Sequence, residues 1–197
     1  MKILITGFEP FGARTINSSW VVAEKVATQG VLGVDVVAER LPVSFLNVAE
    51  SLRRIVVKHN PDIVLLLGQT SLCDYIKLER VALNMMDSKL GDNDGFMPDE
   101  EIIYPGEDMA RLTTLPIKRL HASVNAKGIA AKISNSCGLY VCNRTYYEAL
   151  KLCGEHGHCR AVFIHLPLCE EQHGELTMST SDMITAIETI INELYYE

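Results

Sequence analysis

The segment DIVLLLG at residues 62–68 decides the fold class. Apolar residues follow one another from Ile63 to Leu67 without polar alternation, and Gly68 ends the run. A short continuous apolar run of this kind is typical of a strand that is buried on both faces. Such strands belong to parallel sheets with helices on both sides, so the segment predicts an α/β protein.

Strand-like and helix-like segments alternate on either side of this run. The expected strands are residues 2–6, 34–41, 62–68, 130–135 and 161–166, with a partly alternating segment at 75–84. The expected helices are residues 44–59, 115–127, 143–153 and 178–195, and one more that Asn17 or Ser18 caps and Gly30 ends. We therefore expect a three-layer αβα sandwich with a mainly parallel, mixed central sheet. Residues 85–114 hold turns and no long periodic segment, and such a loop usually covers a site or a subunit contact.

Composition places the chain among ordinary globular proteins, with 197 residues, 48% of them hydrophobic. A chain of this length can bury a single core, so we expect one domain over residues 1–197. The net charge of -7 argues against nucleic acid as a partner, because that binding rests on clustered Lys and Arg. No segment approaches the roughly 20 apolar residues of a membrane span, and no signal peptide is evident, so we expect no membrane partner and a cytoplasmic protein. The six cysteines are scattered, and most are expected to be free thiols.

Several predicted strands end in segments with polar or aromatic residues. Ligands of mainly parallel sheets bind beyond the carboxyl ends of the strands, so these segments are the candidates for a site. They are GFEPFG at 7–12, GQTS at 68–71, SNSCGLYVCN at 134–143 and HLPLCEEQ at 165–172.

Cys142 lies where a loop leads into the predicted helix 143–153. Its sulfur would face unpaired N–H groups and the positive end of the helix dipole, which favours a thiolate nucleophile. Cys137 has no helix start behind it and is expected to be a packed thiol, and an inert buried thiol is the competing interpretation for every cysteine. A redox pair of Cys137 and Cys142 is a further alternative.

His165 could serve as the base of such a nucleophile, because it lies at the end of the strand 161–166. The separation, 165 − 142 = 23 residues, allows one helical crossover, and we expect the strands 130–135 and 161–166 to be adjacent and parallel. A hydrogen-bonded structural histidine is the alternative. The carboxylate that would orient His165 is left open by the pattern among Glu79, Asp74, Glu170 and Glu171.

Neither a metal nor a phosphate-bearing cofactor is predicted. The chain has no CxxC and no HExxH, and Cys153, His156, His158 and Cys159 are compactly spaced but lie on a helix end and turn. The segment GFEPFG lacks the spacing of a phosphate-binding loop, and its two phenylalanines suit the wall of an apolar ligand site better.

Taken together, these motifs resemble the pyroglutamyl peptidase I family, also called pyrrolidone-carboxylate peptidases. The matching pieces, from residue 1 to about 170, are ITGFEPFG, INSSW, PDIVLLLGQ, LERVALN, DNDG, TLPIK, SNSCGLYVCN and FIHLP. The resemblance implies that Cys142 is the nucleophile, His165 the base and Glu79 the acid of a triad. It also implies hydrolysis of the amide after an N-terminal pyroglutamyl residue, through an acyl-thioenzyme, without metal or cofactor. The implied partners are a peptide substrate and further copies of the chain in a dimer or tetramer.

The resemblance also assigns residues around the triad. Ring-contacting positions of the family correspond to Phe8, Phe11 and Val141, Tyr140 stands where the family often has Phe, and Gln69 offers polar groups near the lactam. The backbone N–H of Cys142 is one donor to an oxyanion.

Two departures from the family pattern affect the expected activity. Lys89 occupies the position of a family arginine associated with the oxyanion, and lysine keeps the charge but lacks the planar fork. Residues 70–74, TSLCD, replace a small, Gly-rich and Arg-bearing stretch. These departures motivate an alternative, a binding protein that retains the pocket but has little turnover.

Overall fold

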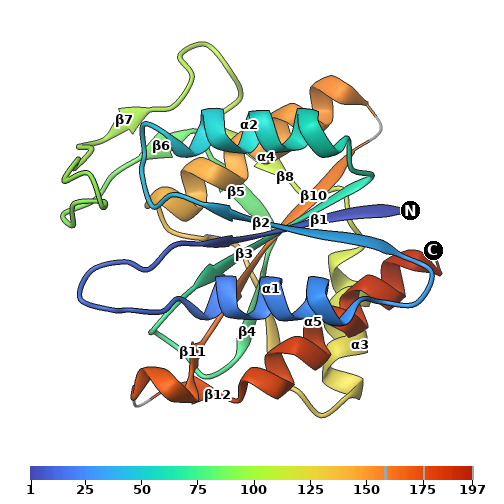
Figure 1. Ribbon diagram of the computed structural model, residues 1–197. Coiled ribbons are helices and arrows are strands. Elements are labelled where there is room, and N and C mark those ends of the chain that lie inside the picture. The colour runs from blue at the N-terminus through green and yellow to red at the C-terminus, as the bar shows by residue number, and fades with distance from the viewer. Residues whose placement is uncertain (158, 175, 197) are drawn as a thin grey trace.

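The centre of the fold is a six-stranded sheet with the order β2-β1-β3-β10-β4-β9 (Figure 1). The computed structural model describes residues 1–157, 159–174 and 176–196. The strands are β1 (Lys2–Phe8), β2 (Asp35–Leu41), β3 (Ile63–Gln69), β4 (Ile76–Glu79), β9 (Ala131–Ser134) and β10 (Arg160–Leu166). Nearly every residue of β1, β3 and β10 is buried, which agrees with the apolar runs in the sequence.

Helices cover both faces of this sheet (Figure 1). One face carries α1 (Ser18–Gln29), α3 (Ile117–Ala126) and α5 (Thr180–Tyr195), and the other carries α2 (Val48–His59) and α4 (Val141–His156). Successive residues of β3 serve the two sides in turn, since Leu65 packs in the core under α1 and α5 while Leu66 packs in the core under α2 and α4. The predicted αβα sandwich is therefore confirmed.

The position of β4 separates two strands that were expected to be neighbours. This strand lies between β10 and β9, antiparallel to β10 and parallel to β9, so the strands predicted at 130–135 and 161–166 are neither adjacent nor parallel. A parallel crossover needs about a dozen residues, whereas only residues 70–75 join β3 to β4. β4 therefore runs antiparallel to β10 and separates it from β9, so the expectation of neighbouring parallel strands was wrong. The resulting sheet is mainly parallel and mixed.

The long segment after β4 folds over the α2 and α4 side as loops and short ladders. β5 (Val81–Leu83) pairs with β8 (Ala110–Leu112), and β6 (Met85–Met86) pairs with β7 (Glu101–Ile102). Tyr104 ties this segment to α4 through a short hydrogen bond to the fully buried Glu148. Two arginines compensate the charge of Glu148, Arg53 at 2.7 Å and Arg144 at 3.0 Å.

Two helix boundaries differ from the predicted ones for local reasons. Residues 44–47 form a turn in which Ser44 Oγ accepts the Asn47 N–H, so α2 begins at Val48. Gly154 does not end α4, which continues to His156 and closes at Gly157, where φ is 72°. The chain after β10 forms β11 (Leu168–Cys169), the 3₁₀ turn η1 (Glu170–Gln172) and β12 (Thr177–Met178). In the described ranges, none of the helices combines the length and apolar character needed to cross a membrane.

Candidate active site

Cys142 is the second residue of α4, and the N-terminus of this helix is open. The N-cap residue Tyr140 makes no side-chain capping bond, and the first N–H groups of a helix have no partner within the helix. The fully buried Asn143 fixes this helix start, since its side chain accepts from the Leu83 N–H at 2.9 Å and donates to Leu83 O and Met85 O at 2.8 Å. The sulfur of Cys142 thus lies at the positive end of an anchored helix.

His165 and Glu79 meet on the face of the sheet that α4 covers. Glu79 lies opposite Phe163 in the antiparallel β4–β10 pair, so its side chain reaches diagonally to His165 two residues further along. Glu79 Oε1 is 2.9 Å from His165 Nδ1, and both side chains are buried. The side chain of Cys142 lies close enough to His165 to raise the pKa of the imidazole. The three residues expected to form a triad are therefore contiguous.

The other carboxylates that the pattern left open lie elsewhere. Glu170 and Glu171 hydrogen-bond to Thr180 at the start of α5, and Asp74 is exposed. Of the four candidates, Glu79 alone contacts His165 in the described part of the chain.

The charges around His165 set its protonation. Burial alone lowers the pKa of His165, but the side chains of Cys142 and Glu79 outweigh burial and raise this pKa to about 9. Burial raises the pKa of the Cys137 thiol well above its usual range, and the negative charges near it act in the same direction. Cys137 is thus a neutral, packed thiol that donates to Asn143 Oδ1 at 3.5 Å, while Cys142 is partly exposed.

Gly68 makes room for the sulfur of Cys142. It pairs with His165 across the parallel β3–β10 ladder. A Cβ atom at Gly68 would lie 2.5 Å from Phe163 Cζ and 3.2 Å from Cys142 Sγ. The glycine therefore allows α4 to bring the thiol onto the strand next to the imidazole.

A small cavity of about 110 Å³ opens beside Cys142. Pockets for drug-sized ligands are typically about 300–1,000 Å³, so this space suits a single small ring. The cavity is lined by Phe8, Phe11, Asn17, Val43, Gln69, Tyr140, Val141 and Cys142. All five side chains predicted to contact the substrate line it.

Asn17 and Val43 are the cavity residues that sequence reasoning missed. The pattern identifies Asn17 only as a helix cap, and its Oδ1 does accept the Ser19 N–H at 3.1 Å, while the residue also lines the cavity. Its place in INSSW, directly after the aromatic loop, was the available signal. Val43 follows the end of β2, and an isolated valine there gave no signal.

Lys89 lies outside the walls of this cavity. It is exposed in the loop after β6, which two hydrogen bonds attach to the start of α4, from the Asp87 N–H to Leu139 O and from Tyr140 Oη to Gly91 O. A contribution of Lys89 to an oxyanion stays a prediction. Residues 70–74 also lie outside the cavity walls, with Leu72 exposed and Cys73 buried.

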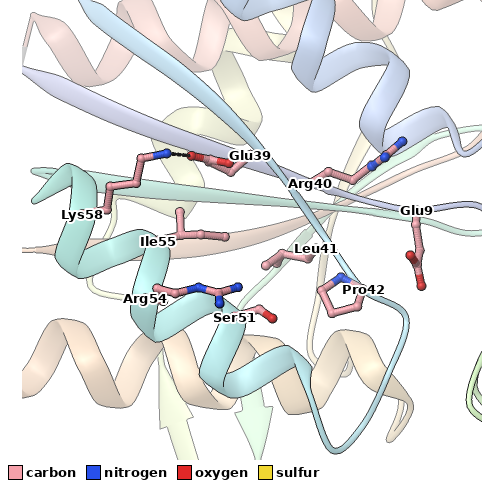
Figure 2. A pocket seen from close by; sticks show the side chains of 9 residues that line it. All are labelled: Glu9, Glu39, Arg40, Leu41, Pro42, Ser51, Arg54, Ile55 and Lys58. Atoms are coloured by element: carbon pink, nitrogen blue, oxygen red, sulfur yellow. Dashed lines mark hydrogen bonds and ion pairs between the residues drawn. The ribbon is translucent and has the colours of Figure 1, made fainter.

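A larger hollow of about 550 Å³ lies between β2 and α2 (Figure 2). Charged side chains dominate it, including Arg40, Arg54 and the ion pair of Lys58 with Glu39 at 2.8 Å. Hydrogen bonds from Lys58 and His59 lower the pKa of Glu39. Among the described residues that line this hollow there is no cysteine or histidine, and its lysine is engaged with Glu39.

The cysteines away from the cavity do not form a metal site with other described residues. Cys153 and Cys159 are joined as a disulfide at the end of α4. Cys73 and Cys169 are free and buried, which agrees with the expectation that most of the cysteines are free thiols. His158, from the compact Cys and His set, lies outside the described residues. Within the described ranges, no group of three or more His, Cys, Asp or Glu is arranged to hold a metal ion.

Comparison with known proteins places the chain in a family. The model of a family described as pyroglutamyl peptidase matches residues 1–194. The chain belongs to the pyroglutamyl peptidase family. The pyrrolidone-carboxylate peptidase of Thermococcus onnurineus is 40% identical over 195 residues, which are 97% of each chain. The protein of the same name from Bacillus subtilis is 35% identical over 98% of this chain and 88% of its own length.

Solved structures of pyroglutamyl peptidases share the fold. A mutant pyrrolidone carboxyl peptidase from Pyrococcus furiosus superposes with a TM-score of 0.94 at 33% identity, covering 100% of this chain and 99% of its own. Pyroglutamyl peptidase I from Bacillus amyloliquefaciens gives a TM-score of 0.91 at 34% identity, covering 96% and 94%. The predicted family and the prediction of a hydrolase are confirmed by these matches.

Proposed function

We propose that this pyroglutamyl peptidase family member is a cysteine exopeptidase that removes an N-terminal pyroglutamyl residue from peptides. The observation that carries the proposal is the continuous chain from Glu79 through His165 to Cys142, which ends at the small cavity. A thiolate at a helix start beside an imidazole is an activated nucleophile. The peptide is thus the proposed partner, and the homo-oligomer and the cytoplasmic location stay predictions.

In the proposed reaction, the Cys142 thiolate attacks the carbonyl carbon of the pyroglutamyl residue. The negative charge moves to the carbonyl oxygen, where the free N–H groups at the start of α4 can stabilise it. The imidazolium of His165 then gives its proton to the leaving amine as the C–N bond breaks, which leaves an acyl-thioenzyme. A water molecule that passes its proton to the neutral His165 attacks the thioester, and pyroglutamate and the thiolate are released.

Glu79 orients His165 in this mechanism. A carboxylate only accepts hydrogen bonds, so the proton on Nδ1 points at Glu79 Oε1 and the other ring nitrogen is left for Cys142. The contact with Glu79 also helps to raise the pKa of His165, so the imidazolium is available to protonate the leaving amine.

The cavity walls favour a neutral ring over a charged N-terminus. Phe11 and Tyr140 have ring centroids 5.3 Å apart and form one apolar wall. Among the described residues that line the cavity there is no Asp or Glu, so an ammonium group would lose its hydration there without gaining a carboxylate partner. A pyroglutamyl lactam carries no such charge, and the NH₂ group of Gln69 can donate a hydrogen bond to it.

Fluorogenic amides test the proposal directly. The pyroglutamyl, prolyl and glutaminyl amides of one fluorophore are compared with the wild-type protein, and we expect kcat/KM for the pyroglutamyl amide to exceed the others by at least about 100-fold. Equal hydrolysis of the prolyl amide would contradict the assignment. Tight binding of the bare lactam pyrrolidinone in calorimetry, without turnover of the amide, would favour the non-catalytic binding protein.

Gly68→Ala should impair both stability and turnover. The new Cβ would press on the buried ring of Phe163 and on Cys142 Sγ, so we expect a loss of about 1–3 kcal/mol in the free energy of unfolding. Displacement of the thiol should lower kcat by about 10- to 100-fold. Denaturant unfolding and the pyroglutamyl amide assay measure the two effects.

Gly154→Ala is the matched control, because it is a glycine of α4 whose added Cβ would meet no atom within 4 Å. It should keep full activity and gain up to about 1 kcal/mol of stability. Equal activity of the two variants would show that Gly68 is not needed for the approach of Cys142.

A further inference from the structure

The side-chain amide of Gln69 is held in one orientation at the wall of the cavity. Its oxygen Oε1 accepts from the Ser18 N–H at 2.8 Å and from Gln172 Nε2 at 2.8 Å. An amide oxygen has two lone pairs, so both acceptor positions are filled. Because a backbone N–H only donates, a turned amide would place the NH₂ group of Gln69 against the Ser18 donor.

The NH₂ group of Gln69 therefore remains for the cavity. In the described part of the chain, Gln69 Nε2 donates to no protein acceptor, and Gln69 lines the cavity together with Cys142. The two hydrogen bonds to Gln69 Oε1 therefore determine that the N–H donors of this amide, and not its oxygen, face a ligand in the cavity.

Gln172 is itself fixed by backbone groups. It lies in η1, and its Oε1 accepts from the Cys169 N–H at 3.0 Å. Its Nε2 donates to Ile16 O at 3.1 Å as well as to Gln69. Since Ile16 O only accepts and the Cys169 N–H only donates, the amide of Gln172 also has a single favourable orientation. Gln172 so connects the loop before α1, the end of β3 and the chain after β10.

We propose that Gln172 is a positioning residue for substrate specificity, which holds the Gln69 amide so that N–H donors face the ring carbonyl of a lactam. This inference rests on the proposed function. Gln172 does not touch the substrate and acts through Gln69.

The chemistry of the ring explains why this orientation matters. A lactam presents a carbonyl oxygen that accepts hydrogen bonds, whereas a prolyl ring presents an amine and no carbonyl. A site built to donate to the carbonyl rejects rings without that acceptor, because its buried donors are then left unpaired. A Gln69 amide turned the other way would set its oxygen against the carbonyl oxygen of the lactam.

Gln172→Glu tests the proposal with almost no change in shape. The carboxylate can still accept the Cys169 N–H, but it places an oxygen against Gln69 Oε1 and Ile16 O. Hydrogen bonds to a charged acceptor are stronger than neutral ones, so the Gln69 amide should turn and donate to Glu at position 172. We expect KM for the pyroglutamyl amide to rise at least about 10-fold, with a smaller change in kcat.

The decisive readout compares two ring ligands by calorimetry, pyrrolidinone and its thiolactam analogue, whose sulfur is a weaker acceptor. The wild type should bind the lactam more tightly, and Gln172→Glu should lose this preference. Gln172→Met, which cannot hydrogen-bond to Gln69 but leaves the Ser18 contact, should keep part of it. A purely structural role would weaken both ligands equally.

Gln29→Glu is the control, because it makes the same change at the exposed end of α1 and should leave both affinities unchanged. A folded Gln172→Glu protein, as judged by its melting temperature, that keeps the wild-type preference for the lactam would overturn the proposal. The ligand comparison measures binding and needs no turnover. It therefore tests the role of Gln172 even if the wild type binds the lactam but does not hydrolyse the amide, so the two proposals can fail separately.

Discussion

Cys142→Ser should lower the hydrolysis of a pyroglutamyl amide by about 10⁴-fold or more. The thiolate form of Cys142 attacks in the proposed mechanism, and a serine hydroxyl at the same place stays protonated and is a much weaker nucleophile. The helix start and His165 are arranged around a sulfur that packs over Gly68. Steady-state and single-turnover assays with the fluorogenic amide measure the loss.

Cys73→Ser is the matched control for this variant. Cys73 is a free, buried thiol outside the cavity, and its sulfur donates to Tyr75 O at 3.2 Å, a bond that a serine hydroxyl can also make. The control should therefore fold and retain activity. If Cys142→Ser retained a tenth of the wild-type rate, Cys142 would not be the nucleophile.

Glu79→Gln should reduce kcat by about 10²- to 10⁴-fold and shift the pH profile. The amide keeps a hydrogen-bonding oxygen of similar size but loses the charge that helps raise the pKa of His165 to about 9. In the wild type the imidazolium that protonates the leaving amine is lost above about pH 9, so activity should fall there. Removing the charge of Glu79 should move this alkaline limb to lower pH.

The same shift predicts how stability depends on pH. Because the pKa of His165 is raised from 6.5 to about 9 on folding, its contribution to stability is complete below about pH 6.5 and is lost as the pH rises through about 9. Denaturant unfolding at several pH values should show this decline in the wild type, and a smaller one in Glu79→Gln.

Glu24→Gln, the same change on the exposed face of α1, serves as the control and should leave the pH profile of kcat/KM unaltered. An unshifted alkaline limb in Glu79→Gln, or a flat wild-type profile from about pH 5 to 10, would argue against the coupling of Glu79, His165 and Cys142.

Local sequence patterns were sufficient for the layers of the fold and insufficient for the arrangement of the sheet. The run in β3 predicted a strand with both faces covered, and Leu65 and Leu66 indeed pack on opposite sides. The reversal of β4 depends on a connection too short for a parallel crossover, which periodicity within the strand does not record.

In the site, too, local patterns predict some residues, whereas others depend on contacts between segments that are distant in the sequence. The helix that follows Cys142 predicts its place, and the loop after the first strand indicates the two phenylalanines of the wall, whereas Gln69, Tyr140 and Val141 were assigned only through the resemblance to the family. Pattern left four carboxylates as partners for His165, and only the diagonal contact across β4 and β10 distinguishes Glu79 physically. The role inferred for Gln172 depends on its contacts with Ile16 O and with the Gln69 amide that Ser18 holds, and these groups lie far from it in the sequence, so no local signal connects them.

Trapping the covalent intermediate tests the role of Cys142 without relying on a substitution. The protein is mixed with a pyroglutamyl ester, quenched in acid within the first turnover, digested and analysed by mass spectrometry. The proposed mechanism predicts a pyroglutamyl group on the peptide that contains Cys142, and no such adduct after prior alkylation of that thiol. Turnover that continues after Cys142 is fully alkylated, or an adduct on a different residue, would contradict it.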